Sequence, residues 1–475
     1  MADIIIRHGI VITVDPERRV IEDGAVAIEG NTIVAVGTTE EVERAHSAPR
    51  VIEAKNHVVM PGLIDAHSHA GHGLIKTIGG GDSKAWFGAC SKIYPVGTTP
   101  GFWEAEALLS ALERLKCGTT TGLSLMGGGD SEMRVDDPRY ADLHCEANRK
   151  IGIRSVLAMG PCRPPFPHTY TDIDGDTVTE KQMTFEQLFE VCEDVVDRWH
   201  GADDRRINVS LLAPVQRRGE HDEVIDVAFE QSGKIRELSR KKGVLFHQDG
   251  HRSGSVKLAQ EEFDALGPDA LLSHCVDLLP EEIEMIASTG TAVAHNPSAV
   301  MSIWGRCPVP ELIDAGATVA IASDGTAPDR SYDMFRHVFQ AMHYHRRHFK
   351  DPQVLPVGKA LEMVTIDAAK AVGLGDIVGS LEVGKRADII LIDMMKPHLY
   401  PLHMPVFRLA CFAVGSDVDT VIVDGRILME NRQVSQVAEA DILAYAQEEM
   451  DAALDRTGTR DMIEEGANIW RGSHY

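Results

Sequence analysis

The middle of the chain alternates strand-like apolar runs with amphipathic helical stretches, and this repeat constrains the fold more than any other feature. A strand that is followed by a helix, again and again, predicts parallel strands joined by crossover helices. The regularity favours a closed (β/α)8 barrel, an α/β fold in which functional groups gather at the C-terminal ends of the strands. The runs that carry the pattern are GTTTGLSL, IGIRSVLAMG, RINVSLLAP, ALLSH, TAVAHNP and ATVAIASDG.

The two ends of the chain differ from its middle because they consist of short strands separated by turns. Residues 1–57 contain DIIIRHG, IVITVD, GAVAIEG and NTIVAVG, which alternate apolar and polar positions and predict a small antiparallel unit. Strands of the same kind return between 379 and 437. We therefore predict one composite β domain from 1–57 and 379–437, a barrel over 58–378, and a helical C-terminal tail over 438–475.

The chain is strongly acidic, which restricts the partners that it can attract. Its 475 residues carry a formal net charge of -25, with 44% hydrophobic and 25% charged residues, as in an ordinary globular protein. A negative surface of this kind argues against binding to nucleic acid or to anionic membranes, and it favours binding of small neutral or cationic molecules. No run is long enough for a membrane span and the first residues lack the features of a signal peptide, so we expect a cytoplasmic protein. The eight cysteines have no CxxC spacing, which indicates neither a cysteine zinc site nor a disulfide scaffold.

Histidines and an aspartate follow several of the predicted strands. His67 and His69 form an His-x-His pair after an apolar run, so both imidazoles point the same way from one extended strand. His247, His274 and Asp324 each end an apolar run of their own. Because the C-terminal ends of barrel strands meet around one opening, we expect these side chains to converge. The pattern therefore predicts a metal site built from distant segments.

Five segments, taken in order, resemble the motif series of the amidohydrolase superfamily, in its branch of chlorotriazine hydrolases and aminoheterocycle deaminases. They are PGLIDAHSHA, FHQDGH, LLSHCVDL, VAHNPSAVMS and ASDGTAPDRSYDMF, and the resemblance covers nearly the whole chain. It implies a distorted TIM barrel with a composite β-sandwich, a homodimer or larger homo-oligomer, and one divalent metal ion. The ligands that the resemblance implies are His67, His69, His247 and Asp324.

These residue types suit metal-assisted hydrolysis. Imidazoles and a carboxylate fit Zn(II) first, and they also fit Fe(II), Co(II) or Mn(II). Coordination lowers the pKa of a bound water toward neutrality. Asp324 then serves as the general base, and His274 polarises the substrate and stabilises negative charge. A two-metal site normally needs a carboxylated lysine on a middle strand, and RINVSLLAP has no lysine, so we predict one ion.

One position departs from the pattern of the deaminases. Relatives in that branch resemble one another in a glutamate three residues after the third metal histidine, where it protonates a ring nitrogen, but here that residue is Gly250. A glycine cannot move a proton. Asp249 or His251 could take over only if the strand stayed regular, and Gly250 disfavours a regular strand. Val215 and Gln216 likewise replace a Pro-His pair of many deaminases.

An acyl carbon needs no ring protonation, so the missing glutamate favours open-chain substrates. We therefore expect a hydrolase that cleaves a non-peptide C–N bond in a small neutral molecule: an N-substituted (phenyl)urea, a carbamate or thiocarbamate, or an amide. Within the superfamily the chain looks most like phenylurea hydrolases and molinate hydrolase. The alternative is an aminoheterocycle deaminase or s-triazine chlorohydrolase. A non-catalytic scaffold paralogue is a minor alternative, because such chains usually lose several ligands.

Large and polar side chains in the loops after the strands are candidates for the substrate pocket. Aromatic and Met side chains there can hold an apolar N-aryl or N-alkyl group, and polar ones can orient it. The same residues can instead pack the long loops of a barrel, and the sequence leaves this choice open. The candidates are Trp86, Phe87, Phe166, Arg163, Gln216, Met301, Trp304 and Asn296.

Overall fold

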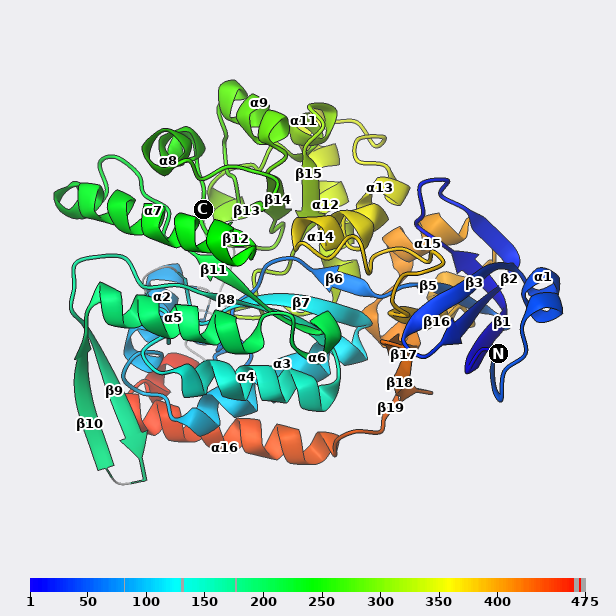
Figure 1. The fold of residues 1–475 in the computed structure, drawn as a ribbon, viewed down its shortest axis with the longest axis horizontal. Coiled ribbons are helices and arrows are strands. Elements are labelled where there is room, and N and C mark those ends of the chain that lie inside the picture. Colours follow the sequence, from blue (N-terminus) through cyan, green and yellow to red (C-terminus); the bar gives the residue numbers. More distant parts are fainter. Residues whose placement is uncertain (81, 130–131, 176, 465–469, 471–475) are drawn as a thin grey trace.

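The structure is a computed structural model that describes residues 1–80, 82–129, 132–175, 177–464 and 470. Figure 1 shows a large α/β part and, on the right of the view, a smaller β part to which segments from both ends of the chain contribute. Among the described residues, no helix combines the length and the apolar character that crossing a membrane requires.

Eight parallel strands form the centre of the large part, and the predicted barrel class is confirmed. They are β6 (Leu63–Asp65), β7 (Thr119–Leu125), β8 (Arg154–Met159), β11 (Ile207–Leu212), β12 (Phe246–Gln248), β13 (Ala270–Ser273), β14 (Ala292–His295) and β15 (Thr318–Ile321), hydrogen-bonded in this order. Between the edge strands, Ile321 N–H donates to Met363 O (2.9 Å) and Ile64 N–H donates to Val364 O (2.8 Å). The segment 363–364 thus nearly closes the barrel.

Helices join these strands and cover the outside of the barrel (Figure 1). Local sequence fixes their ends: Thr99 caps the helix from Pro100 by accepting from Phe102 N–H, and Gly152 ends the next helix in a left-handed turn. The helices are α2 (Ser83–Ile93), α3 (Pro100–Lys116), α4 (Pro138–Ile151), α5 (Phe185–Trp199), α6 (Ala202–Arg205), α7 (Ile225–Lys242), α8 (Ser255–Phe263), α9 (Pro280–Thr289), α10 (Met301–Trp304), α11 (Val309–Asp314), α12 (Met334–Phe349), α13 (Val357–Glu362) and α14 (Ile366–Ala371). A hairpin of β9 (His168–Asp174) and β10 (Thr177–Met183), which lies between β8 and α5 in the chain, projects from the large part at the lower left of Figure 1.

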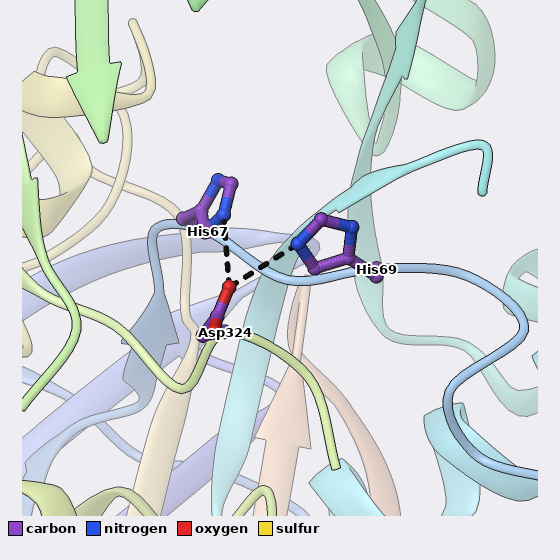
Figure 2. Close-up of side chains that lie close together, drawn as sticks. All are labelled: His67, His69 and Asp324. Carbon is purple, nitrogen blue, oxygen red and sulfur yellow. Dashed lines mark hydrogen bonds and ion pairs between the residues drawn. The ribbon is translucent and has the colours of Figure 1, made fainter. Parts of the chain in front are cut away.

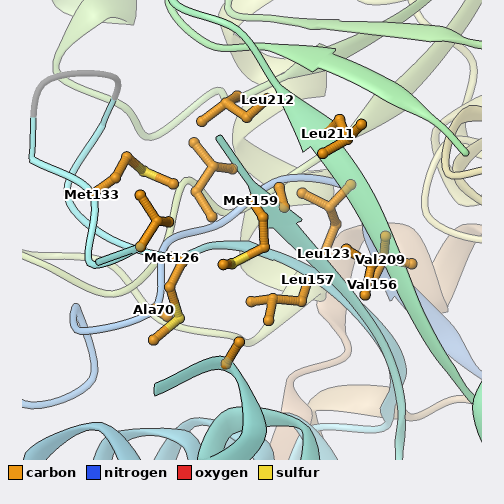
Figure 3. Packing of buried hydrophobic residues seen from close by; sticks show 14 of the residues in the cluster. Ala70, Leu123, Met126, Met133, Val156, Leu157, Met159, Val209, Leu211 and Leu212 are labelled. Atoms are coloured by element: carbon orange, nitrogen blue, oxygen red, sulfur yellow. The ribbon is translucent and has the colours of Figure 1, made fainter. Parts of the chain in front are cut away.

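The interior of the barrel is filled with apolar side chains. Figure 3 shows Leu123, Leu157 and Leu211, from three neighbouring strands, packed with Met126 and Met159. All five are almost completely buried. Strands buried on both faces have near-continuous apolar sequences, which is why these runs could be recognised. Some polar residues within these strands, such as Thr121, Ser124 and Ser210, are buried with them.

Strands from the two ends of the chain share one nine-stranded sheet, as the sequence predicts. In hydrogen-bonding order β19, β18, β17, β16, β5, β1, β2 and β3 follow one another, and β4 pairs with β1. The two ends meet where β5 and β16 pair antiparallel, with Pro61 opposite Ile389 and His57 opposite Asp393. The strands are β1 (Ile4–Ile12), β2 (Val20–Glu29), β3 (Thr32–Thr38), β4 (Arg50–Glu53), β5 (His57–Pro61), β16 (Ile389–Asp393), β17 (Val418–Val423), β18 (Arg426–Glu430) and β19 (Gln433–Val434).

Two details of this sheet correct the sequence prediction. The first two predicted strands are one strand, β1, whose register shifts between Ile6 and Gly9, where His8 has a left-handed backbone (φ +59°). The sheet is also not antiparallel throughout, because β1 pairs in parallel with β4 and β5. The chain passes through α1 (Thr39–Ala45) before it returns, and such a crossover permits parallel pairing.

Two further helices lie in the C-terminal third of the chain. α15 (Pro405–Phe412) packs against α12 and α13, and α16 (Glu439–Thr457) packs along α3. In α16, Ala446, Met450 and Leu454 are buried in the core of the barrel part. Of the predicted tail over 438–475, residues 465–469 and 471–475 lie outside the described residues.

Candidate metal centre

The structure brings the predicted histidines and aspartate together at the C-terminal end of the barrel. His67 and His69 follow β6, His247 lies in β12, His274 follows β13 and Asp324 follows β15. All five are buried. Their convergence follows from the common direction of the strands, which delivers each strand end to one face.

His67, His69 and Asp324 form the group shown in Figure 2. Asp324 Oδ1 lies 3.3 Å from His67 Nε2 and 3.2 Å from His69 Nε2. The three atoms lie within 4.8 Å of one another, close enough to bind one ion. His69 Nδ1–H donates to Gly127 O (2.9 Å), which leaves the lone pair on Nε2 for the centre. A backbone hydrogen bond from Asp324 N–H to His67 O (3.0 Å) joins the two strand ends.

His247 lies against this group, at its edge. Its Nδ1–H donates to Leu271 O (2.9 Å), so Nε2 carries the free lone pair. That Nε2 lies 2.9 Å from His67 Nδ1, whereas Asp324 faces Nε2 of the same His67 ring. Neither three-residue donor group among the described residues includes His247. Its assignment as a metal ligand therefore stays a prediction.

Asp249 adds a second carboxylate, which the sequence interpretation did not expect to reach the centre. Its Oδ1 lies 3.3 Å from His67 Nε2 and 3.2 Å from His274 Nε2, and the three residues form a second donor group. Ser273 Oγ donates to the same oxygen at 2.5 Å. The strand ends at Gln248, but the left-handed turn at Gly250 (φ +97°) leaves Asp249 facing inward. The available signal was the spacing of two from His247, because alternate residues of a strand share a face.

Burial and charge oppose each other in this cluster. Burial disfavours an imidazolium, yet Asp249 and Asp324 raise the pKa of His67 to about 10. Burial also disfavours ionised carboxyl groups, yet His67 holds the pKa of Asp249 well below its usual range, and Arg330 does so for Asp324. Two ionised carboxylates in a buried site attract positive charge strongly, and a cation neutralises them.

The donor set fits a divalent metal ion. His67 Nε2 is buried between the two carboxylate oxygens at 3.3 Å, and among the described residues no group forms a hydrogen bond with it. Two ligand atoms about 2.1 Å from a tetrahedral ion lie about 3.4 Å apart. The distances from Asp324 Oδ1 to His67, His69 and His274 Nε2 are 3.3, 3.2 and 3.5 Å. His67, His69 and Asp324 could therefore hold an ion, with His274 and Asp249 beside it.

Two residues of the centre hold a strained backbone. His274 (φ +65°) and Asp324 (φ +63°) are left-handed, which is uncommon for residues other than glycine. Arg330 Nη2 donates to Asp324 O (3.0 Å), and His274 N–H donates to Ala294 O (3.0 Å). Such contacts hold a conformation that costs on the order of 1 to 3 kcal/mol, and strain of this kind clusters at functional sites.

A cavity of about 360 Å³ adjoins the cluster, and His69, Asp249, His274 and Asp324 are among the residues that line it. Five predicted pocket residues line it: Trp86, Phe87, Arg163, Met301 and Trp304. The sequence interpretation missed Arg217, Arg252 and Arg330, which also line it.

The other three predicted pocket residues lie outside the described lining of the cavity. Gln216 is buried, and its Oε1 accepts a hydrogen bond from Arg163 Nη1 at 3.0 Å. Phe166 packs against His168 and Phe185, with ring centroids 4.8 and 5.8 Å away. Asn296 is buried at the end of β14, next to the last residue of the strand.

Known proteins resemble the chain over nearly its whole length. The amidohydrolase family matches residues 58–428, and an imidazolonepropionase-like composite domain of bacteria matches residues 24–46. The chain is 30% identical to 5'-deoxyadenosine deaminase from Methanosarcina mazei over 472 residues, covering 97% of this chain and 100% of that protein. It is 33% identical to 5-methylthioadenosine/S-adenosylhomocysteine deaminase from Desulforudis audaxviator over 433 residues, covering 89% and 93%.

Solved structures share the fold. An adenosine deaminase from Xanthomonas campestris with bound zinc superposes with a TM-score of 0.81 at 23% identity, covering 96% of this chain and 99% of that one. Atrazine chlorohydrolase from Arthrobacter aurescens TC1, complexed with zinc, gives a TM-score of 0.77 at 23% identity, covering 94% and 100%. The family match spans most of the chain and confirms the predicted resemblance. The chain therefore belongs to the amidohydrolase family and is a hydrolase that acts on carbon–nitrogen bonds other than peptide bonds.

Proposed function

We propose that this chain is a metal-dependent deaminase that replaces the amino group of a nitrogen heterocycle by oxygen and releases ammonia. The proposed substrate class is the 6-aminopurine nucleosides. The names of the curated relatives favour this alternative over hydrolysis of an open-chain urea, because both are deaminases of adenine nucleosides.

The position of Asp249 is the observation that carries the proposal. Deamination at a ring carbon needs a group that delivers a proton to the ring nitrogen, and Gly250 cannot do so. Asp249 lines the cavity, and its Oδ1 lies 3.2 Å from His274 Nε2. A carboxylate is thus available next to the residue where the deaminase pattern requires one.

The side chains of the centre have different proposed roles in the reaction. His67, His69, His247 and Asp324 are the proposed ligands of the ion, which we take to be Zn(II), and Asp249 lies within reach of it. A bound ion of this kind supplies a nucleophile at neutral pH by acidifying water. Asp249 accepts one proton of the attacking water at its carboxylate and passes it to the ring nitrogen. Asp324 accepts the other proton of that water and returns it to the departing amine, which leaves as ammonia. His274 donates from Nε2 and stabilises the negative charge that develops on the substrate.

A second candidate function is hydrolysis of an N-aryl urea or carbamate. The observation that favours it is Gly250, because attack on an acyl carbon needs no proton on a ring nitrogen. Trp86, Phe87 and Trp304 line the cavity and offer surfaces for an aryl group. The two functions differ in their products, so one assay separates them.

The test incubates the zinc-loaded protein separately with 5'-deoxyadenosine, atrazine and a phenylurea. Deamination releases ammonia from the nucleoside in step with conversion of its adenine to hypoxanthine. Dechlorination releases chloride from atrazine, and urea hydrolysis releases an aromatic amine. Ammonia from the nucleoside as the main product supports the proposal, whereas aromatic amine alone supports the second candidate.

Asp249→Asn tests the residue that carries the proposal. General acid–base groups contribute about 10²- to 10⁴-fold to rate, so kcat for deamination should fall within that range. Asp226→Asn is the matched control, because Asp226 is exposed on α7, outside the lining of the cavity, and its loss should leave kcat unchanged. Full turnover by Asp249→Asn with metal bound would exclude the role assigned to its carboxylate.

A further inference from the structure

Arginines gather at the cavity, against the charge of the chain as a whole. Arg163, Arg217 and Arg252 line it, although the formal net charge of the protein is -25. The three follow β8, β11 and β12, which are hydrogen-bonded neighbours in the barrel. Because neighbouring strand ends open on the same side, they place three guanidinium groups beside one another. Arg163 is already engaged by Gln216, so the other two decide what this side of the cavity attracts.

Arg252 has no anionic partner of its own. Its guanidinium carbon lies 4.9 Å from the centroid of the Trp304 ring, and within the described part of the chain it forms no ion pair. Its backbone is held in place, because Arg252 N–H donates to Ser255 Oγ (3.0 Å) and Arg252 forms a parallel bridge with Val276. A guanidinium stacked on an aromatic face keeps its in-plane N–H groups available to a ligand.

Arg217 stands next to it and is partly engaged. Its Nη1 donates to Gly250 O (2.8 Å), and its Nε pairs with the carboxylate of Glu220 (2.9 Å). No hydrogen bond among the described residues uses its Nη2. Burial and the charge of Arg217 lower the pKa of Arg252, so the two cations disfavour each other when no anion lies between them.

We propose that Arg217 and Arg252 form a subsite for an oxyanion on the substrate, a carboxylate or a phosphate. This inference rests on the proposed deamination and refines it, because it names the substrates as anionic aminoheterocycles. It departs from the expectation, drawn from net charge, that neutral or cationic ligands are favoured. The charges next to the ligand matter more than the net charge of the chain, because charges beyond a Debye length of about 8 Å are largely screened at physiological salt. Guanidinium groups suit carboxylate and phosphate through paired N–H donors.

The kinetic test compares three adenine nucleosides that differ only at the 5' position. They are neutral 5'-deoxyadenosine, adenosine 5'-carboxylate and adenosine 5'-monophosphate. In the zinc-loaded enzyme we expect kcat/KM for at least one anionic compound to exceed that for the neutral compound about tenfold or more. Whichever anionic compound has the higher kcat/KM identifies the preferred oxyanion as carboxylate or phosphate. Arg252→Gln should reduce the preference about tenfold, and Arg252→Lys, which keeps the charge and loses the planar fork, should reduce it less.

Arg218→Gln is the matched control. Arg218 precedes Gly219 in the same loop as Arg217, but it is exposed and pairs with Glu262 at 2.9 Å, outside the cavity lining. Its replacement should leave the preference for an anionic substrate unchanged. Melting followed by circular dichroism verifies that each variant is folded.

A binding test separates this inference from the proposed reaction. Benzoate and inorganic phosphate are titrated into the zinc-loaded protein by calorimetry, and the same titrations are made with the Arg217→Gln/Arg252→Gln double variant. We expect at least one of the two anions to bind the unaltered protein, and its Kd to rise about tenfold or more in the variant. An anion that only coordinates the metal would bind both proteins equally.

The outcomes distinguish the two proposals. Arginine-dependent binding of an anion without deamination of any nucleoside would support the subsite and contradict the deaminase. Deamination without a preference for anionic nucleosides, together with equal anion binding by the unaltered protein and the double variant, would overturn the subsite and leave the deaminase standing.

Discussion

Two backbone carbonyls decide which ring nitrogens of the histidines face the metal centre. Gly127 O accepts from Nδ1–H of His69, and Leu271 O accepts from Nδ1–H of His247. Each bond fixes the tautomer and leaves the lone pair on Nε2. The carbonyls lie 58 and 24 residues away from their histidines in the chain. The sequence could therefore place the two imidazoles at strand ends, but it could not orient them.

Asp324→Asn tests the chemistry at this scale. An amide keeps the shape of the side chain but accepts no proton, and it is a weaker ligand for a divalent ion. We expect kcat to fall at least about 10³-fold, because a general base alone contributes about 10²- to 10⁴-fold. The measurement combines turnover with metal content and melting temperature. Asp329→Asn, at an exposed position of the same loop, is the control that should keep activity. Activity of Asp324→Asn within tenfold of the unaltered protein would contradict the assigned base.

At the scale of elements, a buried network of ion pairs connects the N-terminal end of a barrel strand to the composite sheet. Arg154, at the first position of β8, donates from Nε and Nη2 to Asp388 (3.0 and 3.1 Å) and from Nη2 to Asp424 (2.6 Å). Asp388 precedes β16 and Asp424 follows β17. The Arg154 side chain is fully buried. The composite sheet is thus attached at the end of β8 opposite the metal centre, where contacts serve stability rather than chemistry.

Arg154→Met should therefore destabilise the protein strongly. It leaves Asp388 as a buried carboxylate without its guanidinium, and breaking such a network costs about 3 to 5 kcal/mol. Urea unfolding measures the change. Arg205→Met is the matched control, since the Arg205–Asp376 pair is exposed and such pairs contribute at most about 1 kcal/mol. Equal losses for the two variants would show that the buried network does not join the two parts.

At the scale of the whole molecule, buried neutral histidines make stability depend on pH. His144 and His345 are buried, and their ring nitrogens have no hydrogen-bond partner among the described residues. Burial lowers the pKa of His144 to about 3 and that of His345 to about 4. In the unfolded chain both take up protons near pH 6.5. Between pH 6.5 and their folded pKa values the unfolded state binds more protons, so stability falls as pH falls.

His144→Leu should weaken this dependence. An apolar side chain suits a site that offers no hydrogen bond, and it cannot take up a proton on unfolding. The loss of unfolding free energy between pH 7.5 and pH 5 should shrink by about 2 kcal/mol in the variant. His221→Leu, at an exposed position, should leave the loss unchanged. The free energy of unfolding in urea, measured at both pH values, checks the prediction, which an unaltered loss in His144→Leu would refute.

The sequence by itself determined the barrel, the composite sheet and the set of strand ends that carry polar side chains. A continuous apolar run indicates a strand that is buried on both faces. This pattern can be recognised within one segment, without knowledge of its neighbours in the fold. The His-x-His pair at His67 and His69, and Asp324 after its own run, were visible for the same reason. Bulges such as that at His8 were not, because the twist of the sheet and its neighbouring strands decide them.

Only the tertiary structure decided what stands around the metal centre. The turn at Gly250 directs Asp249 inward, and three adjacent strand ends bring Arg163, Arg217 and Arg252 to one cavity. Net charge is a sum over the chain and carries no information on such local gathering, which depends on the order of strands in the barrel. The composition therefore predicted the net charge of the protein. The order of the strands in the barrel decided which charged residues line the cavity.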